Sequence, residues 1–398
     1  MISLRRLHFV LLLTMLFLPT VKAQRVFRIN DDFSIPFGPV DLDLGNVVKL
    51  SASKGFYFGL SAKTNQSFSE HVQFRGYGGY WLKLKGFDYG GSASFSFGNS
   101  LPTSISLHFD HHSATQGEFN SLWDEYDILS PSFYRFTFYE NVNVRGDFFE
   151  TRLTNDITPW LRSYLSFGLS QKNYLRQRYI SPDDPALLQA RYATAELKLN
   201  VHPISTAPVI WTSYTHSFSG ILGSTYDYNR IKVEIYKNLY YKNIGYSSIV
   251  GQFGYVDNGA PVMEAFDIVG TKQFIHLYAP NCFSTMGEDE FICDRFVALF
   301  LSHHFCGLLV PTDWRWSKPQ LTVATNMGWG DFRRAAHAPD RNFKTMEKGY
   351  FESGIVLDGL FRTDFVDFGA SVFYRYGPYA FERTWDNFAF KWNAVVRF

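Results

Sequence analysis

Two adjacent histidine pairs, His111-His112 and His303-His304, are the obvious metal-binding candidates of the chain. Each pair lies in a stretch of alternating apolar and polar residues that predicts a β-strand, and strand neighbours point to opposite faces of a sheet. Neither pair can therefore chelate a metal as a unit, because the ligands of a metal site must converge. We expect no metal site and interpret these histidines as lumen or rim residues near strand ends.

The sequence contains no GxSxG elbow, HExxH pair, phosphate-binding loop or dinucleotide fingerprint. We therefore expect a non-enzymatic protein without a cofactor. A hydrolase built from Ser, His and Asn on neighbouring strands would leave no such motif, so this alternative stays open.

Two charged clusters and three cysteines are the remaining candidate functional residues. Basic residues gather in FRRAAHAPDRNFK, at Arg333, Arg334, Arg341 and Lys344. Arginine pairs well with phosphate oxygens, so these four are candidate phosphate contacts, with a solvated loop as the alternative. The acidic stretch GEDEF (288–290 and its neighbours) is either solvated, paired with basic groups inside the fold, or a cation site. Of the three cysteines, Cys282 and Cys293 are the preferred disulfide pair, and three free thiols are the alternative.

The N-terminus predicts export. Residues 1–23 have a basic start, an apolar stretch and small residues at Val21 and Ala23, which indicates a secretory signal peptide. No later apolar stretch reaches 18 residues, so we expect no transmembrane helix. The net charge of +1 gives no reason to expect nucleic acid binding. The mean hydropathy of −0.14 is compatible with alternating membrane strands, because their two faces average out.

Short alternating segments dominate the rest of the chain, and 18% of all residues are aromatic. The candidate strands number about 16. They begin near residues 56, 71, 87, 103, 132, 146, 160, 191, 208, 228, 243, 293, 319, 349, 364 and 386. Their connections mostly alternate between short and long, as in outer-membrane barrels with short periplasmic turns and long external loops. The segment 112–131 breaks this rule, so either the count slips there or that loop has a role of its own.

The C-terminal segment WDNFAFKWNAVVRF carries an apolar face at every second position and ends on Phe398. Outer-membrane barrels commonly end on an aromatic residue that the assembly machinery reads. Lys391, Val396 and Phe398 are the candidate residues of such a signal, although Asn393 stands where Gly is usual. The fold class is therefore predicted as all-β: a transmembrane antiparallel barrel over 55–398, preceded by a periplasmic lead-in segment over 24–54.

The chain resembles an outer-membrane family at several ordered stretches. They are GFYFGLSAKTNQSFSEHVQFRGYGGYWLKLKGFDYGGSASFSF, STYDYNRIKVEIYKNLYYKNIGYSSIVGQFGYV, EDEFICDRFVALFLSHHFCGLL and MEKGYFESGIVLDGLFRTDFVDF. That family joins a carboxypeptidase-regulatory-like domain to a barrel of the BamA (bacterial surface antigen) type. Neither that domain nor polypeptide-transport repeats are found here, and the Val-Arg-Gly-aromatic motif of the sixth external loop is missing from 257–292. We interpret Val144-Arg145-Gly146 as a coincidence.

The resemblance implies an integral barrel of the cell outer membrane. Its role would lie in envelope biogenesis or in protein or lipid export, with a periplasmic partner replacing the missing domain. The basic cluster would contact lipopolysaccharide phosphates, and the barrel-assembly machinery would act on the C-terminal signal. A porin or specific channel is the first alternative, a barrel lipid hydrolase the second, and a secreted β-sandwich the third.

Overall fold

The computed structural model describes residues 34–51, 54–98, 103–114, 117, 144–175, 189–202, 207–272, 278–287, 289–305, 316–333, 343–363 and 366–396. The predicted signal peptide lies outside these residues. Among them, no helix is long and apolar enough to cross a bilayer.

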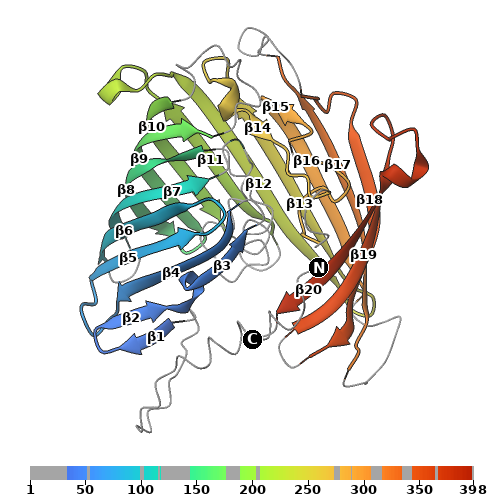
Figure 1. Cartoon of the computed structure of the whole chain (residues 1–398), viewed down its shortest axis with the longest axis horizontal. Coiled ribbons are helices and arrows are strands. Elements are labelled where there is room, and N and C mark those ends of the chain that lie inside the picture. The colour runs from blue at the N-terminus through green and yellow to red at the C-terminus, as the bar shows by residue number, and fades with distance from the viewer. Residues whose placement is uncertain are drawn as a thin grey trace.

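One antiparallel sheet of eighteen strands dominates the described part of the chain (Figure 1). Three strands are short and N-terminal, which leaves fifteen that pair with their neighbours in chain order. These are β4 (Gly55–Thr64), β5 (Val72–Trp81), β6 (Gly86–Phe97), β7 (Thr103–Ala114), β8 (Val144–Thr158), β9 (Leu161–Tyr174), β10 (Gln189–Val201), β11 (Val209–Ser217), β12 (Tyr228–Tyr241), β13 (Gly245–Val256), β16 (Arg295–His304), β17 (Gln320–Asp331), β18 (Tyr350–Arg362), β19 (Val366–Tyr376) and β20 (Phe388–Val396).

The described part of the predicted lead-in belongs to this sheet. It forms β1 (Ser34–Phe37), β2 (Val40–Asp43), the short 3-10 helix η1 (Leu44–Asn46) and β3 (Val48–Ser51). Both β2 and β3 pair antiparallel with β4, β2 near the end of β4 and β3 near its start. They therefore act as one strand interrupted by η1, which brings the wall to sixteen strand positions.

The predicted order of the wall, with a strand near residue 132 between those that begin near 103 and 146, is wrong. β7 pairs directly with β8, from Thr103↔Asn155 to Ala114↔Val144, so no strand lies between them. Residues 118–143 lie outside the described part of the chain. The other fifteen predicted starts lie within two residues of the observed ones. A repeating apolar pattern marks a strand, but it does not say which strand is its neighbour.

This correction removes the conflict over the loops. With one strand fewer, the long connections 115–143, 175–188, 218–227, 257–294, 332–349 and 377–387 all leave the same end of the sheet. That end, which we call the long-loop end, also holds the turn 82–85. The other connections, mostly short, lie at the short-loop end. Such asymmetry is typical of outer-membrane barrels.

The polarity of the two faces of the sheet is inverted relative to a soluble protein, with apolar side chains outside and polar side chains inside. One cross-strand row on the outer face joins six apolar side chains in register: Phe95, Ile105, Leu153, Leu165, Leu197 and Tyr214. Leu165 is 54% exposed. The inner face instead buries polar side chains, among them Lys198, Glu234 and Asn326. Because a large exposed apolar surface is costly in water, this arrangement is that of a wall between lipid and a polar lumen.

Glycines on two neighbouring strands make room for one inward-facing ring. Gly59 on β4 and Gly79 on β5 lie under the side chain of Tyr57, and a Cβ atom at Gly79 would overlap the ring. The ring also packs against Trp81, with 4.9 Å between the ring centroids. These glycines therefore serve close packing inside the wall.

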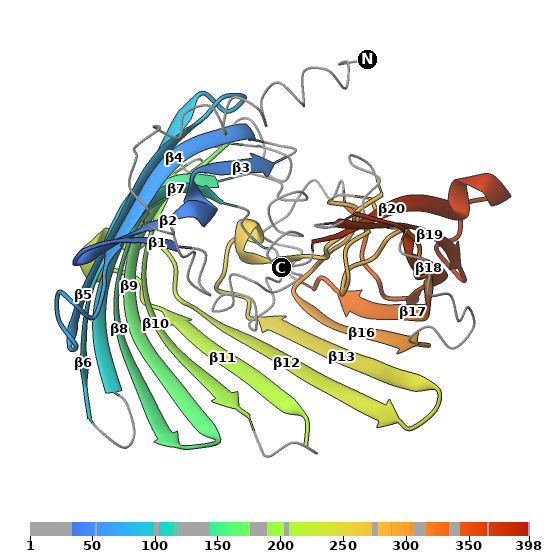
Figure 2. The ribbon, with the colours of Figure 1, turned by 90° about the horizontal axis from the view of Figure 1, so that it is seen from below.

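The sheet curves into an arc, and the described residues show no ladder between its two edges. Seen from below, the arc runs from β1–β4 round to β20 (Figure 2). The ladders of the described residues join β20 to β19, and none of them joins β20 to β1, β2 or β3. We call the interval between these two edges the seam.

The connection 257–294 folds into the concave side of the arc, and we call it the lumen segment. Its described part contains η4 (Val262–Glu264), β14 (Phe266–Asp267) and β15 (Ile292–Cys293), and β14 pairs with β15. Apolar side chains of the lumen segment join those of β16 and β18 in the main buried cluster. Figures 1 and 2 show β14 and β15 inside the curve of the wall.

Candidate functional site: the lumen segment and its wall

Glu352 on β18 anchors the middle of the lumen segment. Its carboxylate accepts hydrogen bonds from the backbone N–H groups of Ser284 and Thr285, both at 2.8 Å, and from the Thr285 hydroxyl at 2.6 Å. The Asn326 side chain on β17 donates a fourth bond at 2.7 Å. The side chain of Glu352 is fully buried. It therefore satisfies backbone donors that have no partner of their own in a strand ladder.

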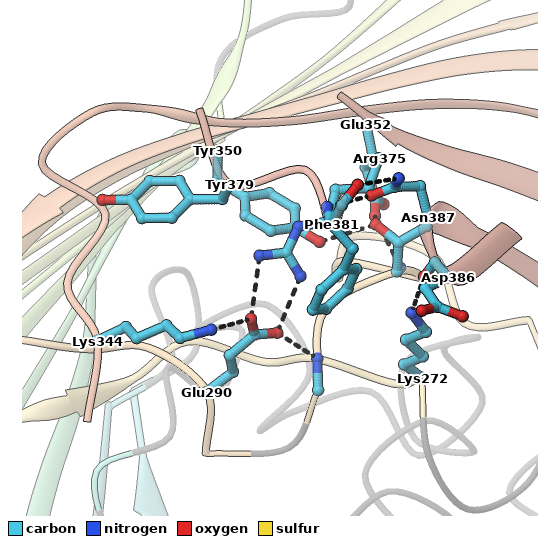
Figure 3. A network of polar contacts seen from close by, with 12 residues as sticks. Lys272, Glu290, Lys344, Tyr350, Glu352, Arg375, Tyr379, Phe381, Asp386 and Asn387 are labelled. Atoms are coloured by element: carbon cyan, nitrogen blue, oxygen red, sulfur yellow. Dashed lines mark hydrogen bonds and ion pairs between the residues drawn. The ribbon is translucent and has the colours of Figure 1, made fainter. Parts of the chain in front are cut away.

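Arg375 on β19 holds the end of the lumen segment. Its guanidinium donates to both carboxylate oxygens of Glu290, at 3.0 and 3.2 Å (Figure 3). The same group lies over the rings of Tyr350 and Phe381, 4.7 and 4.5 Å from their centroids. Arg375 is 1% exposed. A bidentate pair with aromatic contacts fixes both position and orientation.

Glu290 is kept ionised by its neighbours. It also accepts from the Gly287 N–H at 2.9 Å and from Lys344 at 3.3 Å. Burial alone would raise the pKa of this carboxyl group, but the hydrogen bonds from Arg375 and Gly287 and the charges of Arg375 and Lys344 outweigh it and lower the pKa. The acidic stretch of the sequence thus contributes a partner for basic groups inside the fold.

The lumen segment also contacts the last strand at the seam. The Tyr278 N–H donates to the backbone carbonyl of Trp392 at 2.7 Å, and the Tyr278 ring stacks on Phe373 with centroids 5.6 Å apart. The inward-facing ammonium group of Lys391 donates to the carbonyl of Thr271. The lumen segment therefore contacts β20, which in the described residues has β19 as its one sheet neighbour.

The start of the lumen segment is held by ion pairs to β9 and β12. Glu264 in η4 is 1% exposed and pairs with Lys172 of β9 at 3.0 Å and with Arg230 of β12 at 3.4 Å. Burial opposes ionisation of Glu264, but the two cations and their hydrogen bonds outweigh it, so the pKa of the carboxyl group is lowered. The segment thus bridges the lumen between two ionic anchors.

The predicted phosphate contacts are not brought together by the described residues. Arg333 is exposed and pairs with Asp331 at 2.6 Å, while Lys344 belongs to the Glu290 network. Arg334 and Arg341 lie outside the described part of the chain. A contact with lipopolysaccharide stays a prediction.

The predicted assembly signal has one member inside the lumen. Lys391 is 3% exposed and bonded to Thr271, and Val396 ends β20. Phe398 lies outside the described residues. Assembly machinery could read Lys391 only before the wall has folded, and the signal itself stays a prediction.

The predicted disulfide is not formed in the structure, in which Cys282 and Cys293 are buried thiols that are not bonded to each other. The Cys282 thiol donates to the carbonyl of Ala279 at 3.1 Å. Cys293 lies in β15 against Gly330. The two thiols thus occupy different surroundings, which spacing in the sequence does not reveal. Burial is the main reason why the pKa of the Cys293 thiol is raised to about 12.

The paired histidines contact separate partners, as their positions on strands predict. His303 bonds to Ser247, whereas His304 bonds to Thr322 at 2.8 Å. His111 bonds to Asp147 at 2.7 Å, whereas His112 stacks on Phe148. Sequence reasoning missed Glu352 and Arg375. Their only signal was a charge on the polar face of a predicted membrane strand, where an ionised group needs a partner.

Comparison with known proteins supports the fold. No protein-family model matches the chain, and no curated protein matches it. Among solved structures, BamA from Haemophilus ducreyi lacking POTRA domains 1–3 is similar with a TM-score of 0.55 and 10% identity, over 88% of this chain and 68% of that one. CdiB from Escherichia coli is similar with a TM-score of 0.50 and 10% identity, over 91% of this chain and 63% of that one. The chain thus spans about two thirds of the length of each, and it has the antiparallel fold of the BamA and CdiB barrels, as the resemblance implied.

Proposed function

We propose that the protein is an integral outer-membrane barrel of the surface-antigen type, which acts in envelope biogenesis or in protein or lipid export together with a periplasmic partner. This role is non-enzymatic and belongs to the lumen and the seam. The observation that carries it is the docked lumen segment. Ion pairs join its start to β9 and β12 and its end to β19, and it lies beside β20, whose one ladder in the described residues is with β19.

The seam supports a role in handling a client. An unpaired edge offers backbone donors and acceptors to an incoming strand, which is a general mode of peptide binding. Here the backbone carbonyl of Trp392 on β20 already accepts a hydrogen bond from the Tyr278 N–H of the lumen segment. A client strand that pairs with β20 would therefore compete with the lumen segment for this carbonyl group. Lipid and lipopolysaccharide would surround the wall, and the assembly machinery would insert it.

A porin or specific channel is the second candidate. Charged pairs line the inner face of the wall away from Glu352, such as Arg152 with Glu150 at 2.8 and 3.0 Å, and these side chains remain partly exposed. Such residues suit a water-filled path. The docked lumen segment favours the first proposal, because a diffusion pore needs an open lumen.

Membrane fractionation and heat-modifiable gel mobility test the location, and conductance in planar bilayers tests the role. The wild-type barrel should fractionate with the outer membrane, show little conductance, and retain periplasmic proteins in a pull-down. Large, steady conductance of the wild-type protein would instead establish the channel. Recovery in the soluble periplasmic fraction would refute both candidates.

A further inference from the structure

Ser247 and His303 form a hydrogen-bonded pair on the outer face of the wall. They lie directly opposite each other on β13 and β16, and the Ser247 Oγ is 2.9 Å from the His303 Nδ1. The other ring nitrogen, Nε2, lies 2.9 Å from the backbone carbonyl of Ile244 in the turn between β12 and β13. Both Ser247 and His303 are partly exposed. The pair thus stands at the short-loop end of the lipid-facing surface.

The Ile244 carbonyl determines the direction of these bonds. A carbonyl oxygen can only accept, so the His303 Nε2 must carry the proton. The Nδ1 of the neutral ring is then an acceptor, and the Ser247 hydroxyl donates to it. A serine hydroxyl that points at a basic imidazole nitrogen, with the opposite nitrogen held by an acceptor, has the arrangement that nucleophilic catalysis requires.

A donor for a developing oxyanion lies beside the serine. The Tyr241 hydroxyl is 3.5 Å from the Ser247 Oγ, and its ring is 5.8 Å from the His303 ring. Tyrosine hydroxyls can stabilise the negative charge of a tetrahedral intermediate. The group therefore contains a nucleophile, a base, an orienting carbonyl and an oxyanion donor.

Two other serine–histidine pairs in the described residues lack these features. In the inward-facing pair Ser302 and His304, the ring bonds to Ser302 at 3.1 Å and to Thr322 at 2.8 Å, so hydroxyl groups face both nitrogens and neither fixes the tautomer. Ser106 and His108 are 2.8 Å apart but also face the lumen. Of the three pairs, the Ser247 pair alone combines a fixed tautomer with exposure on the outer face.

We propose that Ser247 and His303 form an acyl-transfer site for the ester bonds of membrane lipids. The neighbouring outward side chains include Val323, which is 42% exposed, and Tyr241, also 42% exposed. An apolar surface that ends in a tyrosine marks the boundary between acyl chains and head groups, which is where the ester carbonyls of phospholipids lie. This activity goes beyond the proposed role in export, and it uses the opposite face of the wall.

The chemistry needs only the lipid and water. The Ser247 oxygen attacks the ester carbonyl carbon while its proton moves to the His303 Nδ1, and Tyr241 donates to the oxyanion. The C–O bond to the glycerol oxygen then breaks, and that oxygen takes the proton from His303. Water attacks the resulting acyl-serine in the same way, with His303 again as the base. The products are a free fatty acid and a lysophospholipid.

The test uses the full chain, reconstituted in vesicles of phosphatidylethanolamine and phosphatidylglycerol, with a fluorophosphonate as a probe for nucleophilic serines. The wild-type protein should be labelled at Ser247 and should release fatty acid. Ser247→Ala should abolish both, and His303→Gln should lower both by about 10²- to 10⁴-fold, because glutamine cannot act as the base. Tyr241→Phe should slow fatty-acid release by about 10²-fold.

Ser302→Ala is the matched control, because it removes the hydroxyl of the inward pair on the same strand, and it should leave labelling and release unchanged. Heat-modifiable mobility of every variant verifies that the wall has folded. Labelling of the folded wild-type protein that persists in Ser247→Ala, or no labelling at all, overturns the proposal. Labelling with hydrolysis of a water-soluble ester but not of vesicle lipid overturns the assignment of the substrate.

Discussion

Replacing Arg375 with methionine should release the end of the lumen segment from the wall. Methionine preserves most of the apolar length of the side chain but removes the guanidinium group. Glu290 would lose two charge-assisted hydrogen bonds and keep those from Gly287 and Lys344. This carboxylate, whose side chain is 14% exposed, would thus be left partly unpaired.

The magnitude follows from this partial loss. Removing one partner of a buried ion pair costs about 3–5 kcal/mol, and the lower end applies here because Glu290 retains two donors. Each 1.4 kcal/mol changes an equilibrium tenfold, so about 3 kcal/mol raises the undocked population of the lumen segment roughly 10²-fold. In the double variant Arg375→Met with Glu290→Gln, the loss in docking free energy should be smaller than the sum of the losses in the two single variants. The reason is that no charge of this pair is then left without its partner.

The two buried thiols provide the assay. Cys282 and Cys293 are 2% and 0% exposed, and both lie in the lumen segment. Their labelling by a water-soluble maleimide should require undocking, so in a Cys306→Ser background its rate should rise about 10²-fold in Arg375→Met. Arg333→Met is the control, because it removes an exposed arginine paired with Asp331 and should leave the rate unchanged.

Equal labelling rates in the wild type and Arg375→Met would refute the assignment of this ion pair as an anchor. If the loss in docking free energy in the double variant equalled the sum of the losses in the two single variants, the coupling between Arg375 and Glu290 would be refuted. Either result would mean that the Glu352 hydrogen bonds and the apolar contacts suffice to hold the lumen segment.

Three further predictions test other parts of the structure. The pKa values of Glu264 and Glu290 are lowered from the ordinary value of 4.5. The contribution of these two carboxylates to docking is therefore complete above pH 4.5 and is lost as the pH falls through the lowered pKa values. Channel-like openings in planar bilayers should accordingly appear only below pH 4.5. Leu165→Arg on the lipid-facing row should cost about 2–4 kcal/mol and reduce the heat-modifiable folded fraction, whereas Leu165→Ile should not. Gly79→Ala places a methyl group in the Tyr57 ring and should cost about 1–3 kcal/mol in denaturant unfolding, and an unchanged midpoint would show that the ring can move aside.

Most of the wall could be predicted from local pattern. Alternation with a period of two marks each strand, because one face meets lipid and the other a polar lumen. The same pattern could not exclude the extra strand near residue 132, since it contains no information about pairing. The lead-in was misjudged because β2 and β3 are each four residues long and separated by a 3-10 turn, so neither is long enough to show the alternation.

The lumen anchors could not be predicted because they join distant segments. Glu352 bonds to residues 67 and 68 positions away, and Arg375 reaches Glu290 across 85 positions. A charged residue on a polar face indicates only that some partner exists. The choice among partners depends on how a long connection folds, which is determined by the packing of the rings of Phe283 and Phe291 against Tyr350.

The lumen segment leaves β13 and returns in β16, and these two strands are direct neighbours in the wall. Both attachment points of the segment therefore lie side by side in the wall. Undocking of the segment toward the long-loop end would therefore leave the ladders of β13 with β16 and of β16 with β17 intact. Undocking of the segment would also break its hydrogen bonds to β20, from the Tyr278 N–H to the Trp392 carbonyl and from Lys391 to the Thr271 carbonyl, so a change in the lumen and a change at the seam are coupled.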